Sequence, residues 1–311
     1  MNQKYKSLIA IVLAVWLFGM GFVVGKDAGS KSAPASSTQQ VTEEAQVAEK
    51  PTKPNLGGST DNGGTNNGGA TNNGGATDNG TNNGGTTNNG GANNGGSTAV
   101  DPTQYSKDQI IQMMNYYVNL VKSESNMTAT KTEVIKVEVT DCSVPALVNT
   151  INGIVAGVIG DESESITYSF VNDKEAGGGT PFSLIPPTNK QFEVTAEGVA
   201  SASVTKDENG NYVYTVVLVP ESTTMASPEP RFNATAIGYL DLAGIDVSPA
   251  KIEQADMSYP GSTVSITVDA NDRVVKLYNK LPMSGVGKAK LGLSGEASFE
   301  GALDETWVFT Y

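Results

Sequence analysis

The sequence predicts that residues 101–311 fold as an α+β domain with a curled, mostly antiparallel sheet shaped like half of a barrel. Apolar residues recur at helical spacing in two early segments, 106–121 and 143–158. After residue 160, nearly every segment alternates apolar and polar residues, as strands do. Short turns join these segments, and strands joined in this way run antiparallel. We therefore expect two helices on one face of a sheet of about eight strands.

The first helix is predicted from its capping signal. Ser106 is followed three residues later by Gln109, which is the spacing of a capping box. The apolar residues after it lie on one helical face: Ile110, Met113, Met114, Tyr117, Leu120 and Val121. Residues 128–139 then alternate and predict a strand.

The second helix is predicted to begin at Ser143 with Pro145 in its first turn. Its apolar face holds Leu147, Val148, Ile151, Ile154, Val155 and Val158. Two glycines in this segment lower its intrinsic helical stability, unless they let another backbone approach closely.

The remaining segments predict strands. Residues 199–205 and 212–219 flank an Asn-Gly pair at 209–210, which indicates a hairpin. Asn271-Asp272 predicts a second turn between two strands. The last strand is expected to carry four large apolar side chains on one face, and these could line a ligand site or fill the core: Leu303, Trp307, Phe309 and Tyr311.

The first 25 residues predict a membrane anchor. An uncharged apolar run extends from Leu8 through Trp16 to Val24, and Lys4 and Lys6 precede it. A helix of about 26 Å nearly spans the hydrocarbon core, so we expect the lipid bilayer as a partner. Lysines on the short side hold that end in the cytoplasm, and the rest of the chain is then exported. The alternative is a cleaved signal peptide and a secreted product.

Residues 26–100 predict a disordered linker. They are polar and rich in Asn, Gly and Thr, with a drifting T-N-N-G-G-A repeat from residue 56 to 98. Such residues cannot offset an ordering cost of ~1–2 kcal/mol each. A flexible chain of this length has a root-mean-square span of about 48 Å. It would carry the domain away from the membrane, through a thick wall or simply as a spacer.

Composition excludes several classes of function. The chain has 33 acidic and 20 basic residues, no histidine and one cysteine, and its net charge is −13. A surface of this sign disfavours nucleic acid. Without histidine there is no Ser-His-Asp or Cys-His chemistry and no H-E-x-x-H zinc site. A single cysteine forms no intrachain disulfide. We expect no cofactor, no metal and no enzymatic activity.

Four short motifs have ordinary structural explanations. Residues 281–285, L-P-M-S-G, resemble a wall-sorting signal but stand far from a terminal apolar segment, and Pro282 is expected to end a strand at a sheet edge. S-x-x-K at 203–206 and 248–251 lacks the S-D-N and K-T-G partners of penicillin-interacting enzymes. The 1-3-5 spacing from Asp207 lacks the later calcium ligands. Cys142 is expected to be a small buried side chain.

Two resemblances follow from these patterns. The order of two helices and then antiparallel strands is similar to the half-barrel domains of bacterial export proteins that carry lipids and lipoproteins. The closing segments Y-N-K-L-P at 278–282 and E-T-W-V-F-T-Y at 305–311 resemble those of uncharacterised exported α+β domains of wall-bearing, Gram-positive type bacteria. Neither resemblance implies an activity.

The favoured hypothesis is a non-enzymatic, membrane-tethered surface protein whose domain binds an apolar ligand or a cell-wall component on the concave side of its sheet. A hydrolase of wall polymer built on carboxylates is the first alternative, although neighbouring acids on a strand point to opposite faces. The acidic pairs in question are Glu162 with Glu164 and Asp304 with Glu305. A structural or adhesion spacer is the second alternative.

Overall fold

The computed structural model describes residues 50–56, 100–150, 152–153, 164–175, 179–240, 251–291 and 293–311. The expected membrane span from Leu8 to Val24 and nearly all of the expected linker lie outside these residues. Within the described ranges, no helix is long and apolar enough to cross a membrane.

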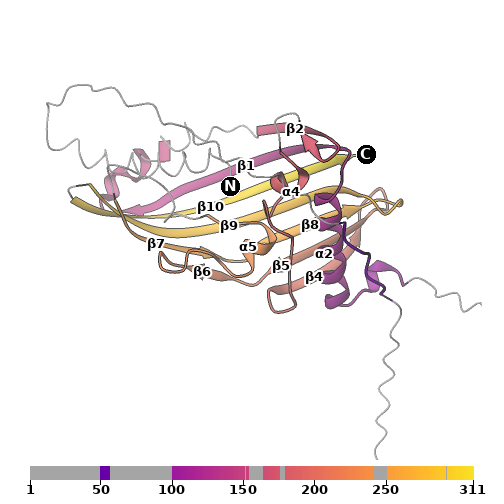
Figure 1. Ribbon diagram of the computed structural model, residues 1–311. Coiled ribbons are helices and arrows are strands. Elements are labelled where there is room, and N and C mark those ends of the chain that lie inside the picture. Colours follow the sequence, from indigo (N-terminus) through magenta and orange to yellow (C-terminus); the bar gives the residue numbers. More distant parts are fainter. Residues whose placement is uncertain are drawn as a thin grey trace, which may run out of the picture. The chain divides into compact units, whose positions relative to one another are not determined.

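The described residues form an open, antiparallel sheet with few helices, which confirms the α+β class (Figure 1). Eight strands follow the order β3-β2-β1-β10-β9-β8-β5-β4, while β6 pairs with β7 and β7 pairs with β9. The strands are β1 (Met127–Cys142), β2 (Glu164–Val171), β3 (Lys174–Glu175), β4 (Val199–Lys206), β5 (Tyr212–Leu218), β6 (Glu221–Thr223), β7 (Lys251–Tyr259), β8 (Thr263–Val268), β9 (Val274–Leu291) and β10 (Leu293–Thr310).

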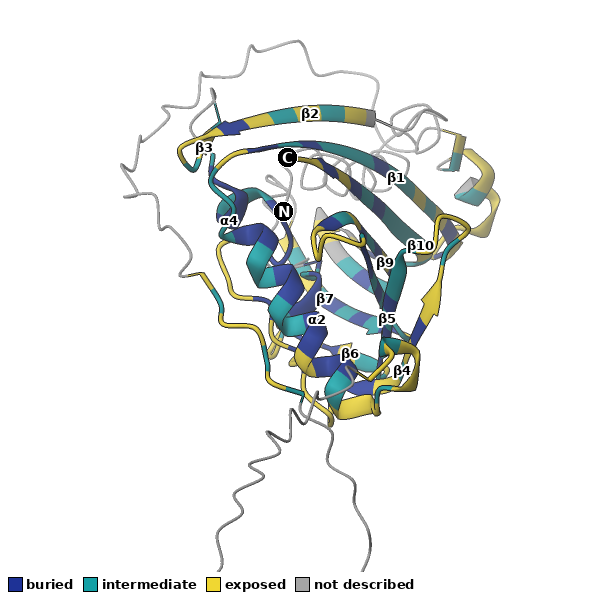
Figure 2. Cartoon of the chain, turned by 90° about the vertical axis from the view of Figure 1, so that its right-hand side faces the viewer, coloured by how far each residue is buried: buried dark blue, intermediate teal, exposed yellow. Residues whose placement is uncertain are grey.

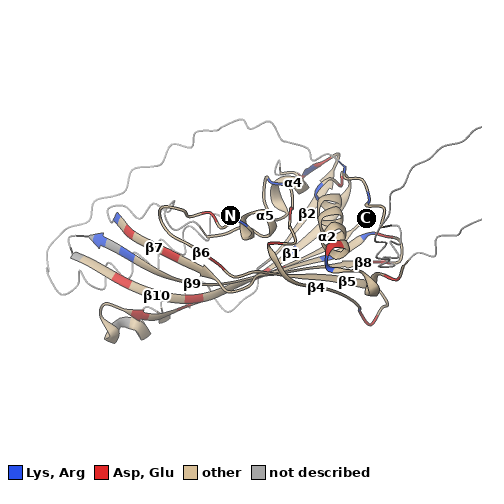
Figure 3. Ribbon diagram, turned by 90° about the horizontal axis from the view of Figure 1, so that it is seen from below, with Lys and Arg blue, Asp and Glu red and all other residues tan. Residues whose placement is uncertain are grey.

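The helical elements are short except for one. They are η1 (Pro102–Gln104), α2 (Lys107–Lys122), η2 (Pro145–Leu147), α4 (Pro181–Leu184) and α5 (Asn233–Ala236). Figure 3 shows α2, α4 and α5 on one side of the sheet, with the far halves of β7, β9 and β10 extending beyond them.

Helix α2 begins as the sequence predicts. The Ser106 side chain accepts a hydrogen bond from the Gln109 backbone, and the Gln109 side chain accepts one from the Ser106 backbone at 2.9 Å. These reciprocal bonds satisfy two of the amides that a helix start leaves free. The buried side of α2 faces the sheet (Figure 2).

Two asparagines on α2 hold an extended segment beside the helix. Asn115 exchanges hydrogen bonds of 3.0 and 2.9 Å with the backbone of Val194. Asn119 exchanges bonds of 2.8 and 2.9 Å with Phe192. Residues four apart on a helix lie on one face, so these two amides replace the ladder that a neighbouring strand would supply.

Lys122 is the last residue of α2, and its side chain is buried inside the domain. It is 1% exposed and donates to the carbonyls of Phe182 at 3.3 Å, of Pro187 at 2.8 Å and of Ile185. Burial lowers the pKa of its ammonium group to about 7. The residue therefore ties the α4 loop to the end of α2.

The structure corrects the prediction for Pro282, which does not end a strand. It lies in the middle of β9, opposite Ala302 of β10. On the other edge of β9, the pairing with β8 ends at Lys280 and the pairing with β7 begins at Ser284. Proline lacks an amide hydrogen, and here it occupies the gap between two partner strands, where a ladder bond is not required.

The second predicted helix is described only in part. Residues 145–147 form η2, and 148–150 and 152–153 are helical. The positions Ile151, Ile154, Val155 and Val158 lie outside the described residues.

Candidate functional site

The inner face of the sheet is the face that contacts α2. The ring of Tyr117 on α2 lies 5.5 Å from the ring of Tyr214 on β5. Residues directly opposite each other in an antiparallel pair share a face. The register therefore places Ile266, Leu277 and Trp307 on the inner face with Tyr214.

A row of polar side chains crosses this same face on three adjacent strands. Glu305 of β10 lies opposite Asn279 of β9 on one side and opposite Glu133 of β1 on the other. Lys131 lies two residues before Glu133 on β1, so the two side chains share a face. We call Lys131, Glu133, Asn279 and Glu305 the polar row. Glu133, Asn279 and Glu305 are 7%, 1% and 5% exposed.

The charged members of the polar row pair with one another. Lys131 Nζ lies 3.2 Å from Glu305 Oε2 and also pairs with Glu133 Oε2. Burial opposes the charge of Lys131, but the two carboxylates outweigh it and raise its pKa. Burial raises the pKa of Glu305, while Lys131 and the indole of Trp307 act in the opposite direction. The lysine is therefore held as a cation between two carboxyl groups.

Aromatic rings enclose one end of the polar row. The Trp307 indole donates to Glu305 Oε1, and its ring stacks on Tyr168 of β2 with 5.6 Å between centroids. Lys131 Nζ lies 5.8 Å from the centre of the Trp307 ring. A cation over an indole face is attracted by the ring quadrupole, which adds to the two ion pairs.

Asn279 differs from the rest of the polar row. Neither its Nδ2 nor its Oδ1 has a hydrogen-bond partner among the described residues, although its side chain is buried. An unpaired buried polar group costs about 1–3 kcal/mol. Its neighbour across the strands, Val264 on β8, is apolar and fully buried. The amide thus presents one donor and one acceptor that the fold does not use.

Beyond the polar row, the inner face becomes apolar. Leu281 and Met283 of β9 are buried, while Ile135, Leu303 and Phe299 keep part of their surface exposed. Phe299 lies opposite Gly285, where an added Cβ would come within 2.7 Å of its ring. We call these five side chains the apolar zone. Asn279 lies two residues before Leu281 on β9, at the border of this zone.

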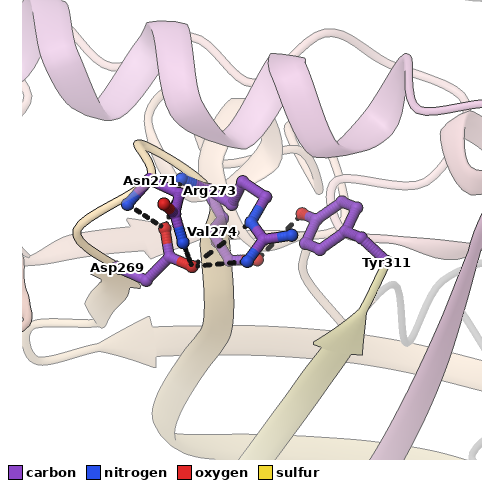
Figure 4. A network of polar contacts seen from close by, with 5 residues as sticks. All are labelled: Asp269, Asn271, Arg273, Val274 and Tyr311. Carbon is purple, nitrogen blue, oxygen red and sulfur yellow. Dashed lines mark hydrogen bonds and ion pairs between the residues drawn. The ribbon is translucent and has the colours of Figure 1, made fainter.

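The four side chains predicted to line a ligand site differ in their surroundings. Trp307 and Phe309 are buried, at 1% and 4% exposure, and Leu303 belongs to the apolar zone. Tyr311 is 43% exposed at the end of the sheet. Its hydroxyl donates to the Val274 carbonyl at 2.8 Å, and its ring lies against Arg273 (Figure 4). Tyr311 therefore contacts the β8–β9 turn and does not line the polar row.

The sequence interpretation named Glu305 only as half of an acidic pair and missed Lys131, Glu133 and Asn279. A signal was present, because Glu305 falls between Leu303 and Trp307 on a face read as apolar, and Asn279 falls between Leu277 and Leu281. A polar residue at an apolar-face position is the informative exception in such a pattern. The pairing that unites these strands was not visible in the sequence.

Asp304 and Glu305 lie on opposite faces, as expected for neighbours on a strand. Glu305 faces inward, while Asp304 accepts a hydrogen bond of 2.6 Å from the hydroxyl of Tyr278 and lies on the other face. Glu164 of β2 lies opposite Glu133. Glu162 lies outside the described residues.

The other motifs have structural roles. Asp207 accepts hydrogen bonds of 2.9 Å from the amides of Asn209 and Asn211, which confirms the hairpin between β4 and β5. Ser203–Lys206 lies within β4, away from any helix start. Cys142 is buried and donates to the Val144 carbonyl.

Comparisons with models of protein families, with curated proteins and with solved structures found no match to this chain. The two resemblances drawn from the sequence therefore stay predictions.

Proposed function

We propose that residues 101–311 form a non-enzymatic binding domain, displayed outside the membrane by the N-terminal anchor, for an apolar ligand that carries an amide group. The ligand's apolar body would lie on the apolar zone, and its amide would pair with Asn279.

The unpaired amide of Asn279 is the observation that carries the proposal. An amide side chain offers an acceptor and a donor side by side, and a ligand amide offers the complementary pair. Lys131 forms ion pairs with both Glu133 and Glu305, although Glu133 Oε2 makes no hydrogen bond among the described residues. Asn279 is the member of the polar row whose buried side chain has neither a hydrogen bond nor an ion pair among those residues.

The charges of the polar row favour a neutral head group. Two carboxyl groups and one ammonium lie next to Asn279, so the row has no excess of positive charge. A ligand carboxylate would meet Glu305 across the strand from Asn279 and would be repelled. Amides occur in acylated peptides and in the peptide and N-acetyl groups of cell-wall polymers, which keeps a wall component within the proposed class.

The carboxylate hydrolase is less well supported. Glu133 and Glu305 lie opposite each other, but both pair with Lys131. A general acid and base must be free to exchange a proton with the substrate. Lys131 engages both carboxyl groups, so neither is free in this way.

Binding can be tested on the full chain in lipid nanodiscs with three probes that share one alkyl chain: hexadecanamide, hexadecanoate and hexadecane. The chain has two tryptophans, Trp16 in the apolar N-terminal run and Trp307 next to Glu305. A Trp16→Phe background therefore reports on Trp307 emission. We expect hexadecanamide to bind more tightly than either other probe.

The decisive variant is Asn279→Leu, which removes the amide and keeps the approximate volume. We expect at least a tenfold loss of hexadecanamide affinity, together with a stabilisation of the ligand-free protein by about 1–3 kcal/mol because an unpaired buried amide is removed. Asn209→Leu makes the same change in the β4–β5 turn and should alter neither property. Equal binding of all three probes, or unchanged affinity in Asn279→Leu, would refute the proposal.

A further inference from the structure

A short segment from the expected linker lies against the folded domain. Residues 50–54, K-P-T-K-P, fall in the same compact unit as the residues from Pro102 onward. We call residues 50–54 the strap. The sequence interpretation placed this segment within a disordered tether.

The strap is held at one point by a charge. Lys53 Nζ lies 2.6 Å from Asp272 Oδ2, and it lies 5.8 Å from the centre of the Tyr117 ring on α2. The other oxygen of Asp272 accepts a hydrogen bond of 2.6 Å from the Tyr117 hydroxyl. One carboxylate thus joins the strap to helix α2.

The turn that presents Asp272 is held by hydrogen bonds that do not involve the strap. Asp269 accepts hydrogen bonds of 2.9 Å from the amides of Asn271 and Arg273, and it pairs with the Arg273 guanidinium (Figure 4). These bonds lower the pKa of Asp269 although burial acts in the opposite direction. Asp272 itself has a φ of 63°, a backbone conformation that Asp and Asn tolerate better than most residues.

The strap has the composition of a peptide ligand. Its two prolines stand three residues apart and are both partly covered, while Thr52 and Lys53 between them are exposed. Proline restricts the backbone, so a segment with this spacing loses little entropy when it docks. Proline-rich peptides with basic residues commonly bind surfaces that combine aromatic rings and an acid. Tyr116 and Tyr117 supply the rings here, and the centroids of these two rings lie 5.1 Å apart.

We infer that Asp272, Tyr116 and Tyr117 form a docking surface for a lysine-containing, proline-rich peptide, and that the chain's own strap occupies it intramolecularly. An exposed ion pair is worth only about 0.2–1 kcal/mol. Attachment within one chain spares the strap much of the entropy cost of association, and the partly covered prolines and the Tyr117 ring add to the ion pair.

The inference can be tested by a distance measurement on the full chain. Spin labels would be placed at Thr52→Cys on the strap and Gln112→Cys on the exposed side of α2, since both side chains are exposed. The native Cys142 is buried and reacts slowly by comparison. Pulsed electron spin resonance should give a narrow distance distribution for the docked strap.

Two substitutions should release the strap without disturbing the fold. Lys53→Ala and Asp272→Asn each remove one charge of the pair, and asparagine keeps the conformation of the turn. We expect the narrow population to fall about two- to fivefold in either variant, and to fall in 1 M salt. Lys50→Ala removes the same charge from the same segment and should leave the distribution unchanged.

Three results would overturn the inference. A broad distribution in the parent protein would show that the strap is not docked. An equal effect of Lys50→Ala and Lys53→Ala would show a general charge effect. A narrow population that disappears on dilution would show that the strap of a second copy occupies the surface.

Discussion

Glu305 occupies a position of β10 where the alternation of apolar and polar residues predicts an apolar side chain. It is 5% exposed, and its two oxygens are used by the Trp307 indole and by Lys131. These partners offset part of the cost of burying a carboxylate but not all of it, so its pKa stays above the ordinary value. The residue therefore couples the stability of the domain to pH.

Glu305→Gln isolates that coupling. The ordinary pKa is 4.5, and the folded pKa is higher, so the folded state loses stability through this group as the pH rises from about 4.5 through the folded pKa. Glutamine does not titrate and still accepts from Trp307. We expect the variant to gain stability relative to the parent between pH 4 and 8, by about 1 kcal/mol or more in urea unfolding.

The comparison needs a carboxyl group of the same kind outside the polar row. Glu300 of β10 is exposed, so Glu300→Gln should show a difference that does not change over this range. A constant difference for Glu305→Gln as well would mean that its pKa is not raised by burial.

Lys122 couples stability to pH in the opposite direction and in another range. Its pKa is about 7 in the folded chain and ordinarily 10.5, so the unfolded state binds more protons between these values and stability rises with pH. Lys122→Met removes this rise. It also removes a donor from three carbonyls, of which those of Phe182 and Pro187 still accept from the amides of Asn189 and Lys190. The loss should cost about 1–3 kcal/mol at pH 7.

Urea unfolding at pH 7, 8 and 9 measures both effects of Lys122→Met. Lys107 also donates to backbone carbonyls, those of Ala196 and Val199, but it is exposed. Lys107→Met should therefore cost less and show no difference in pH dependence. An equal pH response of the two variants would contradict the role given to burial.

At the scale of the elements, the long strands β1 and β10 approach each other closely at a glycine. A Cβ on Gly301 would lie 2.5 Å from the carbonyl oxygen of Lys136 on β1. Gly301→Ala must therefore shift one backbone away from the other, and we expect a loss of about 1–3 kcal/mol in thermal or urea unfolding.

Gly153 provides the matched control for Gly301. It lies in a helical stretch, and a Cβ there would have nothing within 4 Å. Gly153→Ala should be neutral or should stabilise by up to about 1 kcal/mol. A neutral result for Gly301→Ala would show that the two strands can separate at no cost.

Local signals predicted the elements whose determinants are close in sequence. The capping box at Ser106 and the hairpin at Asp207 depend on residues within five positions of each other, and both are confirmed. Pro282 was misread because its effect depends on which strands lie beside β9, and that is a property of the pairing. Local sequence indicates which segments form strands, but it does not show which strands pair with each other.

At the scale of the whole domain, the first strand pairs with the last. β1 and β10 match from Thr128 with Thr310 to Cys142 with Ala297. This contact between distant parts of the chain brings Glu133 to Glu305, and the adjacent β9 brings Asn279. The class of the domain followed from periodicity alone. The polar row could not be predicted, because it exists only after that long-range pairing has formed.

The position of the strap determines how the molecule would respond to mechanical force. If the N-terminus is fixed and a bound ligand is pulled away, tension enters the domain through Lys53 and Asp272 at the β8–β9 turn. An exposed ion pair is worth only about 0.2–1 kcal/mol, so this contact should break before the sheet unfolds. After it breaks, the force would reach the domain at its N-terminal end, near Pro102.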